Sequence, residues 1–416
     1  MDTESAARDD AGWKSTILAA IANYIDAGSI VSCAAALSLW VEQYHLSTPF
    51  VGLLGAIGAN SISAGIGAII GGRLCDLFGR RKIYLFNMLF YAIGMLWLVF
   101  AVAPWMLVVG FVQVGLAVGA SLPASWSLIA DQAPQGARGQ RSGLAQALWY
   151  FGPVVVLLMS LVLMPLGILG ARIVFAHLAL LAVALMLMRS GMQESERWKM
   201  AKAEEGGSKA ADPRELLKPK HVKSLLFLVS MYGAWNLWAG TNGFFLPYIL
   251  HTVGAQTQAA SVAFQALSFA VGILSIVFVF MRYSDRANQR LMFVTGAVIG
   301  TIGMAVMALF PLTTPVALIY VVLTSAGGGF SAQPFFQLWS AELFPTLLRS
   351  TAQGIAFALV RIGLGCWSFF VPILTATGFT TLAWILTGCQ AASGLIGVIW
   401  APRHEGKSLE EIQAGL

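Results

Sequence analysis

Two charged residues each lie in the middle of a stretch that otherwise has the composition of a membrane span. Asp26 lies in "ANYIDAGSI" and Arg361 lies in "FALVRIGLG". A charge at this depth costs at least about 2.5–3.5 kcal/mol on insertion scales, so such residues usually face a cavity, find a partner and mark a transport path. A guanidinium keeps its charge and presents a bidentate fork to a planar anion. We expect Arg361 either to balance Asp26 or to hold an anionic substrate. The alternatives are a structural hydrogen bond for Asp26 and packing against carbonyl groups for Arg361.

The elements that must position these charges are transmembrane helices. Of the 416 residues, 58% are hydrophobic and 11% are charged, whereas soluble domains carry about 25% charged residues. A spanning helix needs roughly 20 predominantly apolar residues, and such windows recur along the whole chain. The expected fold is an all-α polytopic membrane protein with twelve spans, at 14–41, 50–72, 83–103, 105–130, 142–166, 171–189, 224–250, 259–281, 291–311, 314–340, 351–375 and 379–400.

The distribution of charge predicts the orientation of these spans. Apart from Arg172 and Arg361, the 25 Lys and Arg residues fall in the termini and alternate loops, on one side of the twelve-span arrangement. Positive residues mark the cytoplasmic side, so both termini and the loop at 190–223 are expected there. This topology explains the excess positive charge, and nothing indicates a nucleic-acid partner. The four cysteines lack metal-ligand spacing and no nucleotide-binding motif occurs, so we predict no metal, no cofactor beyond a coupling proton and no primary pumping.

The two halves of the chain repeat each other. The loop after the fourth span is matched by the loop after the tenth, and the loop after the second span by the loop after the eighth. Duplicated six-helix halves are typical of transporters that bind their substrate near the midplane between the halves. The matching residues are Asp131 with Glu342, Arg138 with Arg349, and Asp76 with Asp285. The expected divisions are a six-helix bundle at 1–189, a cytoplasmic linker at 190–223, a second bundle at 224–400 and a cytoplasmic tail at 401–416.

The loop after the second span also carries a family resemblance. "GGRLCDLFGRRK" (71–82) resembles the signature loop of the major facilitator superfamily, with Leu77 where a basic residue is usual. The resemblance covers the whole chain and implies two pseudo-symmetric bundles that rock about a central site. Carboxylates and guanidiniums at their cytoplasmic ends can pair and then separate, unless these charges only set topology. The expected cytoplasmic gate residues are Gly72, Asp76, Gly79, Arg80, Arg81, Asp131, Arg138, Asp285, Arg286, Glu342 and Arg349.

Three further stretches are similar to the sugar porter branch of that family, namely "ESERW" (194–198), "AELFPTLLRSTAQG" (341–354) and "GKSLEEI" (406–412). Porters of organic anions and aromatic acids share several of these loops. The resemblance implies substrate-binding amides at Gln146, Asn236 and Asn242, with Gln337 in place of a tryptophan of span ten. Amides donate and accept hydrogen bonds at once, which suits hydroxylated ligands. Trp149, Tyr150, Trp235 and Trp238 are expected on cavity-lining helices, as ligand contacts or as membrane filler.

The resemblance also implies a function for Asp26. In proton-coupled sugar porters the acidic residue of the first span binds the proton and an arginine of the fourth span tunes it. Phe111 occupies the arginine position here, so the tuning must come from elsewhere, and Arg361 is the candidate. We expect Arg361 to serve Asp26 and the substrate in turn. His177 lies in an outer span, where a structural histidine is expected.

These features predict a monomeric secondary transporter of a bacterial inner membrane, embedded in the lipid bilayer. The preferred activity is proton symport of a small hydroxylated metabolite, such as a sugar or sugar acid, by alternating access. The chief alternative is transport of an organic or aromatic carboxylate held by Arg361. A drug exporter is disfavoured by the amide-rich cavity, and a non-transporting receptor by the lack of room for a signalling domain.

Overall fold

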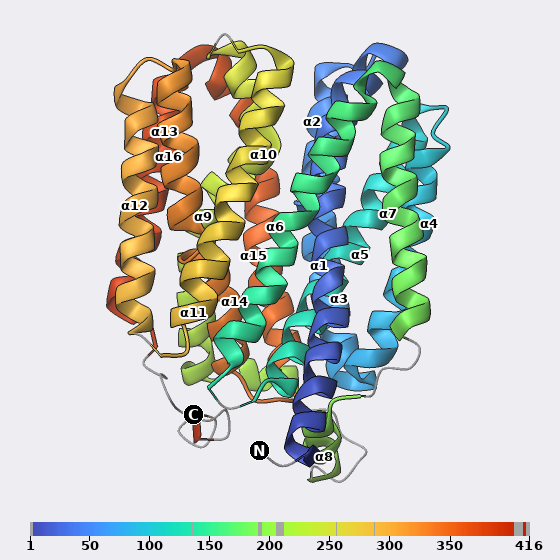
Figure 1. Cartoon of the computed structure of the whole chain (residues 1–416), viewed down its shortest axis with the longest axis vertical. Helices are drawn as coiled ribbons and strands as arrows, with labels where there is room; N and C mark the ends of the chain where they lie inside the picture. The colour runs from blue at the N-terminus through green and yellow to red at the C-terminus, as the bar shows by residue number, and fades with distance from the viewer. Residues whose placement is uncertain are drawn as a thin grey trace.

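The chain folds into two groups of long helices that stand side by side (Figure 1). The computed structural model describes residues 3–134, 136–189, 194–204, 212–254, 256–286, 288–402 and 411–412. Within these ranges every regular element is helical. In the view of Figure 1, α1 to α7 lie on the right and α9 to α16 on the left. The expected all-α architecture of two bundles is therefore confirmed.

The first group contains the helices of the N-terminal half. They are α1 (Thr3–Tyr44), α2 (Thr48–Ile57), α3 (Ile62–Phe78), α4 (Arg80–Val99), α5 (Pro104–Gln132), α6 (Arg138–Leu163), the 3-10 turn η1 (Met164–Leu166) and α7 (Ile168–Arg189). Two short elements follow, α8 (Glu196–Glu204) and η2 (Pro213–Leu217). The remainder of the expected linker, at 190–193 and 205–211, lies outside the described residues.

The second group contains the helices of the C-terminal half. They are α9 (Pro219–Thr252), α10 (Gln258–Ser275), the π-helical segment η3 (Ile276–Phe280), α11 (Met281–Tyr283), α12 (Gln289–Leu309), α13 (Thr314–Gly328), α14 (Ala332–Glu342), α15 (Arg349–Ser368) and α16 (Val371–Trp400). Most of the expected tail, including most of "GKSLEEI", lies outside the described residues.

Two of the expected spans are broken near their middle. The span at 50–72 divides into α2 and α3 at residues 58–61, and the span at 314–340 divides into α13 and α14 at residues 329–331. The second break lies in the glycine-rich stretch "SAGGGF" (325–330), which allows both bending and close packing. A Cβ on Gly327 would lie 2.3 Å from the carbonyl oxygen of Gly296, so only glycine permits this approach of α13 to α12.

Hydropathy distinguishes two helices of the interior from the other membrane passes. Ten helical stretches of the described chain are long and apolar enough to cross a membrane. Two of the twelve passes, α9 and α15, are not among them, although they contain 34 and 20 residues. A polar residue inside a spanning helix usually faces the interior of the bundle. The lower hydropathy of α9 and α15 therefore marks them as helices of the site.

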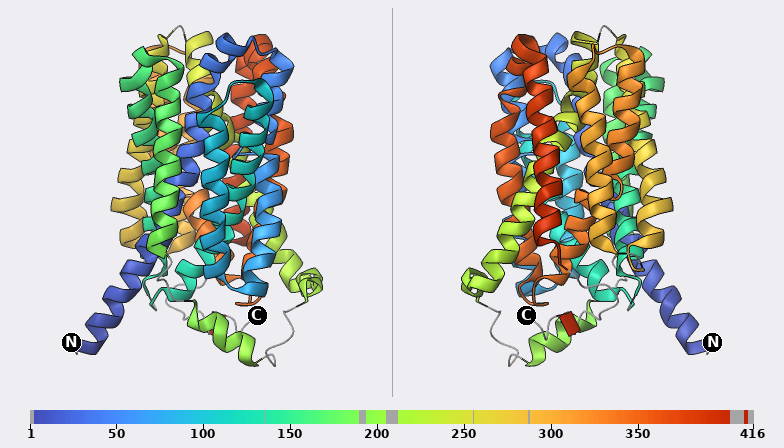
Figure 2. Two further views of the ribbon diagram at one scale, coloured as in Figure 1. Left: turned by 90° about the vertical axis from the view of Figure 1, so that its right-hand side faces the viewer. Right: turned by 90° about the vertical axis from the view of Figure 1, so that its left-hand side faces the viewer.

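The outer surface of the bundle is apolar, as contact with lipid requires. Large side chains such as Val162, Leu180 and Phe86 are 78%, 70% and 68% exposed. Exposed apolar area on this scale is rare on soluble proteins and is expected on the lipid-facing side of a membrane protein. The beginning of α1, the end of α16 and helix α8 all lie at one end of the molecule (Figure 2).

Candidate functional site: a central cavity and an ionic network

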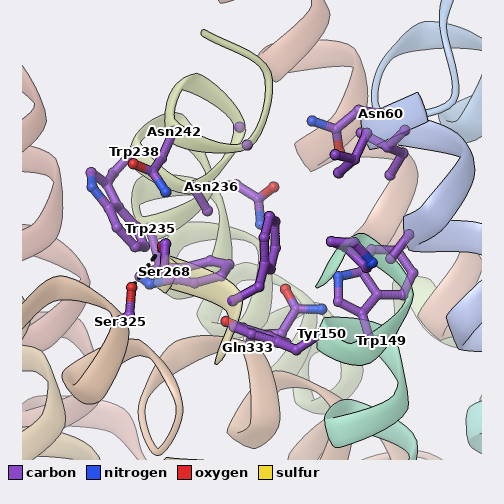
Figure 3. A pocket seen from close by; sticks show the side chains of 18 of the residues that line it. Asn60, Trp149, Tyr150, Trp235, Asn236, Trp238, Asn242, Ser268, Ser325 and Gln333 are labelled. Carbon is purple, nitrogen blue, oxygen red and sulfur yellow. Dashed lines mark hydrogen bonds between the residues drawn. The ribbon is translucent and has the colours of Figure 1, made fainter. Parts of the chain in front are cut away.

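A cavity of about 80 Å³ lies between the two halves of the chain. The first half supplies one residue of the α2–α3 break, Asn60, and side chains from α1 and α6, while the second half supplies side chains from α9, α10, α13, α14 and α15. Figure 3 shows Trp149 and Asn60 on one side of the cavity and Trp238 and Asn242 on the other. A small ligand held here would contact both halves at once, as alternating access requires.

Seven of the ten residues expected to bind substrate or proton line this cavity: Trp149, Tyr150, Trp235, Asn236, Trp238, Asn242 and Arg361. The three that do not are Gln146, Gln337 and Asp26. Gln146 and Gln337 are 1% and 2% exposed, and they lie outside its lining. The structure thus places these two amides outside the cavity, and their expected part in substrate binding stays a prediction. The sequence pattern shows that a residue lies on a helix, but it does not show whether the side chain points into the cavity or packs against a neighbouring helix.

Four polar residues of the lining were not anticipated: Asn60, Ser268, Ser325 and Gln333. Asn60 and Gln333 lie at or next to the two helix breaks, where an interrupted helix brings polar side chains into the interior. The hydroxyls of Ser268 and Ser325 are 2.7 Å apart and bond α10 to α13. The glycines near both breaks are the one sequence signal that could have pointed to these positions.

Aromatic rings form one wall of the cavity. The rings of Trp235 and Trp238 meet edge to face with centroids 5.6 Å apart, and Tyr150 meets Phe269 edge to face at 5.6 Å. Indole and phenol rings offer a flat apolar surface together with a polar edge. This wall can therefore lie against the ring of a bound ligand.

The polar groups at this wall are of two kinds, groups that are hydrogen-bonded to each other and donors that have no acceptor among the described residues. The Tyr320 hydroxyl donates to Asn242 Oδ1 at 2.7 Å and accepts from Trp238 Nε1 at 3.2 Å. By contrast, Trp235 Nε1 and Asn236 Nδ2 are buried and meet no acceptor in the described chain. A buried donor without an acceptor is costly, and a ligand oxygen would relieve that cost.

Arg361 lies at the edge of the cavity with the side chain of Asn60 as its partner. Its Nη1 donates to Asn60 Oδ1, and the guanidinium lies 4.5 Å from the centre of the Phe357 ring. Its Nε meets no acceptor among the described residues, and the cavity lining contains no carboxylate. No ion pair joins Arg361 to Asp26 in this structure. The expectation that Arg361 balances Asp26 is therefore not met in this conformation.

Asp26 occupies a separate buried position on α1. Its side chain is fully buried, and neither carboxylate oxygen meets a hydrogen-bond donor in the described chain. The Ser121 hydroxyl lies nearby without hydrogen-bond geometry, and Arg189 is the charged residue that acts on Asp26. Arg189 is itself buried and donates from Nε to the Leu18 carbonyl at 2.9 Å. The positive charge that acts on Asp26 thus comes from the end of α7, a source that sequence reasoning missed.

Two other residues singled out in the sequence have packing roles. Phe111 is 3% exposed and meets Trp40 edge to face at 5.8 Å. His177 Nε2 lies 3.3 Å from the Tyr24 hydroxyl, which fits the expected structural histidine.

A buried network of charges joins the halves at the end of the molecule where α8 lies. Arg349 binds Asp131 Oδ1, and Arg138 Nη2 lies 2.8 Å from Glu342 Oε1. The two ion pairs are equivalent under the pseudo-symmetry of the halves. In one pair the first half contributes the acid and the second half the arginine, and in the other pair these contributions are reversed. Arg80 adds contacts to Asp131 Oδ2 at 3.7 Å and to Asp76 Oδ1 at 3.6 Å.

Two further carboxylates of this network cap helices of the opposite half. Asp76 Oδ2 accepts from the backbone N–H and the hydroxyl of Thr351, both at 2.7 Å, in the first turn of α15. Asp285 accepts from the backbone N–H groups of Gly139 at 2.8 Å and Gln140 at 2.9 Å, in the first turn of α6. A carboxylate at a helix N-terminus satisfies free N–H groups and interacts favourably with the helix dipole.

The remaining gate candidates lie around this network. A Cβ on Gly72 would lie 2.3 Å from the Ser350 carbonyl oxygen, so glycine lets α3 approach α15. Gly79 has φ +96°, and Glu194 bonds the backbone N–H groups of Arg80 and Arg81 that follow it. The side chains of Arg81 and Arg286 are exposed.

Comparison with known proteins agrees with this architecture. Residues 16–366 match the model of the Major Facilitator Superfamily. The chain is 43% identical to the minor myo-inositol transporter IolF of Bacillus subtilis (strain 168), over 98% of this chain and 95% of that protein. It is 24% identical to a cis,cis-muconate transport protein of Acinetobacter baylyi (strain ATCC 33305 / BD413 / ADP1), with 93% of each chain covered.

The fold also matches solved transporters. The proton:xylose symporter XylE from E. coli, bound to 6-bromo-6-deoxy-D-glucose, superposes with a TM-score of 0.83 at 18% identity, over 98% of this chain and 99% of that one. The resemblance seen in the signature loops is thereby confirmed, and so is the twelve-pass membrane architecture. The chain belongs to the Major Facilitator Superfamily of membrane transporters.

Proposed function

We propose that this transporter takes up a cyclic polyol, with myo-inositol as the first candidate, together with a proton. The observation that carries the proposal is the cavity, in which Trp235 Nε1 and Asn236 Nδ2 lack acceptors beside an aromatic wall. A ring with many hydroxyl groups supplies the missing acceptors and an apolar face for the indoles. The 43% identity to a myo-inositol transporter supports the same ligand class. Both walls of the cavity come from one chain, so a monomer suffices.

Asp26 is proposed as the proton-binding group. It is a fully buried carboxylate without a hydrogen-bond donor, and it lies on the same helix as three residues of the cavity wall, Ala27, Ile30 and Val31. A buried ionised carboxylate pays a large desolvation cost, which protonation removes. Protonation of Asp26 would therefore favour the occluded state, and release of the proton would favour opening.

The charged network is proposed as the cytoplasmic gate. It joins the halves through two exchanged ion pairs and two exchanged helix caps, so it must break when the bundles separate at that end. The excess of basic residues in the loops on this side supports a cytoplasmic position for the network and for both termini. We place the protein in the inner membrane of a bacterium by analogy with its relatives.

A second candidate substrate is a polyol acid or another organic carboxylate. The specific observation is that Arg361 lines the cavity with a free Nε and no carboxylate in the lining. A ligand carboxylate would complete the pairing of the guanidinium. The similarity to a muconate transport protein is consistent with this candidate.

Uptake by proteoliposomes tests both proposals. The purified protein is reconstituted with the interior at pH 7.5, and uptake of labelled myo-inositol is followed with the exterior at pH 6.0 or pH 7.5. Accumulation that requires the pH gradient, and that excess unlabelled myo-inositol abolishes, supports the primary proposal. Uptake of labelled gluconate or muconate in the same assay, with no uptake of labelled myo-inositol, supports the second candidate, and uptake of neither class overturns both.

A further inference from the structure

A second hollow lies at the outer edge of the N-terminal bundle, away from the central cavity. It has a volume of about 520 Å³ and is bounded by α8 and by the adjoining ends of α3 and α4. Figure 2 shows α8 extending across the base of the bundle, just beyond the helix ends. The hollow therefore lies at the level where the membrane core gives way to the headgroup region.

The rim of this groove is strongly basic. Arg81 and Lys82 from α4 and Lys199 and Lys202 from α8 line it, and Glu194 is the one acidic residue of the lining. The Glu194 carboxylate is already occupied, since it accepts from the backbone N–H groups of Arg80, Arg81 and Ser195 at 3.1, 3.0 and 3.0 Å. Four basic side chains thus line the groove, and its single carboxylate is used for helix capping. One of the four, Lys199, also pairs with Glu196 of the same helix at 2.6 Å.

The floor of the groove is apolar and continues into the membrane. Leu77, Phe78, Leu85 and Phe86 line it, and Phe78 and Phe86 are 56% and 68% exposed. Further along α4, beyond the groove, the exposed side chains are also apolar: Leu89 is 44%, Phe90 41% and Ile93 44% exposed. An apolar track therefore leads from the basic rim toward the middle of the bilayer.

We propose that this groove between α4 and α8 binds an anionic phospholipid of the phosphatidylglycerol class. The phosphate lies among Lys82, Lys199 and Lys202, and an acyl chain follows the exposed face of α4 past Phe86. Basic side chains at the cytoplasmic surface attract anionic headgroups, and a track of exposed apolar side chains matches a hydrocarbon chain. Charge on the rim and hydrocarbon along the floor together fit a lipid better than a soluble anion or a peptide.

Such a lipid would strengthen the closed gate. Helix α8 already holds the end of α3, because Trp198 Nε1 donates to the Asp76 carbonyl at 3.0 Å and Lys202 Nζ donates to the Leu77 carbonyl at 3.1 Å. Asp76 in turn caps α15 of the other half. A lipid bound to α4 and α8 at once therefore stabilises the segment that holds Asp76 in place.

The test compares lipid binding by the full-length protein and two matched triple variants. Native mass spectrometry in detergent measures binding of dioleoyl-phosphatidylglycerol, with dioleoyl-phosphatidylcholine and glycerophosphoglycerol as reference ligands. The groove variant is Lys82→Gln/Lys199→Gln/Lys202→Gln. The control variant, Arg214→Gln/Lys218→Gln/Lys220→Gln, removes the same charge from exposed positions around η2 and the start of α9.

The expected result is preferential binding of phosphatidylglycerol that the groove variant loses and the control variant keeps. At roughly 1 kcal/mol for each basic residue near an anionic headgroup, the loss is on the order of a hundredfold in affinity. Equal binding by both triple variants, equal binding of phosphatidylcholine, or equally tight binding of glycerophosphoglycerol would overturn the proposal. If the groove variant does not fold, Lys82→Gln alone is used, with an expected loss of about fivefold, and unchanged affinity would count against the proposal. None of these readouts depends on the identity of the transported substrate.

Discussion

Asp76 and Asp285 occupy equivalent positions in the two halves, and each caps the first turn of a helix in the opposite half. Asp76 bonds Thr351 in α15, and Asp285 bonds Gly139 and Gln140 in α6. Each cap lies next to an ion pair that also crosses between the halves. Because caps and ion pairs share this pseudo-symmetry, separation of the bundles at this end must break all of them together. Such an arrangement favours two discrete states over a continuous range.

The first prediction concerns these exchanged caps. Asp285→Asn keeps one acceptor but loses the charge that strengthens two backbone hydrogen bonds, a loss of about 1–2 kcal/mol. We expect a lower unfolding midpoint in a thermal scan and slower pH-driven uptake. Asp212→Asn is the matched control, because Asp212 caps the isolated turn η2 at 2.9 Å from Arg214 N without joining the halves. Equal effects of the two substitutions would show that the cap on α6 has no special role in the gate.

The second prediction concerns the ion pair between Arg138 and Glu342, whose side chains are 9% and 1% exposed. Breaking one partner of a buried pair leaves an uncompensated charge and costs about 3–5 kcal/mol. Arg138→Glu is therefore expected to destabilise the protein strongly, whereas Arg138→Glu combined with Glu342→Arg recovers part of the loss. A double-mutant cycle from denaturation midpoints measures the coupling energy. Additive effects would mean that the pair contributes no specific link between the halves.

The third prediction concerns the proposed proton site. Asp26→Asn removes the titrating group but keeps nearly the same side-chain volume. Since Asp26 lies outside the lining of the cavity, substrate binding should persist while coupling to the proton is lost. We expect the variant to exchange labelled for unlabelled substrate across the membrane, yet to show no accumulation driven by a pH gradient. Accumulation at the wild-type level would remove Asp26 from the coupling mechanism.

The sequence predicts the helices and the gate better than the cavity, and the reason is physical. Long apolar windows determine the spans. The duplicated loops carry the residues of the ion pairs Asp131–Arg349 and Arg138–Glu342 at matching positions, which can be seen in the sequence. The cavity depends instead on helix rotation and on helix breaks. Gln146 lies on an expected span but outside the cavity lining, while Asn60 enters the cavity because α2 ends before it.

The partners of the two charges near mid-membrane also could not be predicted from the sequence. The partner of Arg361 is Asn60, 301 residues away along the chain, and no local pattern points to it. The cation acting on Asp26 is Arg189, which sits at the far end of α7 and reaches α1 through the Leu18 carbonyl. Pairings of this kind depend on which helices are neighbours in space, and neither composition nor spacing contains that information.

The fourth prediction separates the two candidate substrates. Arg361→Lys keeps the charge but loses the planar fork, so bidentate binding of a carboxylate should weaken by about 1.5–3 kcal/mol, roughly ten- to a hundredfold. A neutral polyol, bound mainly by amides and indoles, should lose much less. The measurement is competition by myo-inositol and by gluconate against one labelled substrate, in the wild type and the variant. Similar losses for both competitors would show that Arg361 does not select for an anionic group.

The last prediction concerns the contact of α3 with α15, where the two halves of the protein approach closely through small residues. A Cβ on Gly72 would lie 2.3 Å from the Ser350 carbonyl oxygen and 3.4 Å from Gly354 Cα, and these atoms belong to the backbone of α15. Backbone cannot rotate away as a flexible side chain can, so Gly72→Ala must push the helices apart next to the Asp76 cap. We expect the variant to weaken the closed gate, seen as a lower unfolding midpoint and several-fold slower uptake. Gly363→Ala is the matched control, because an added Cβ there meets nothing within 4 Å on the same helix α15. Alanine favours a helix by about 1 kcal/mol over glycine, so the control should be neutral or slightly stabilising. If Gly72→Ala behaves like this control, the close approach of α3 to α15 is not needed for transport.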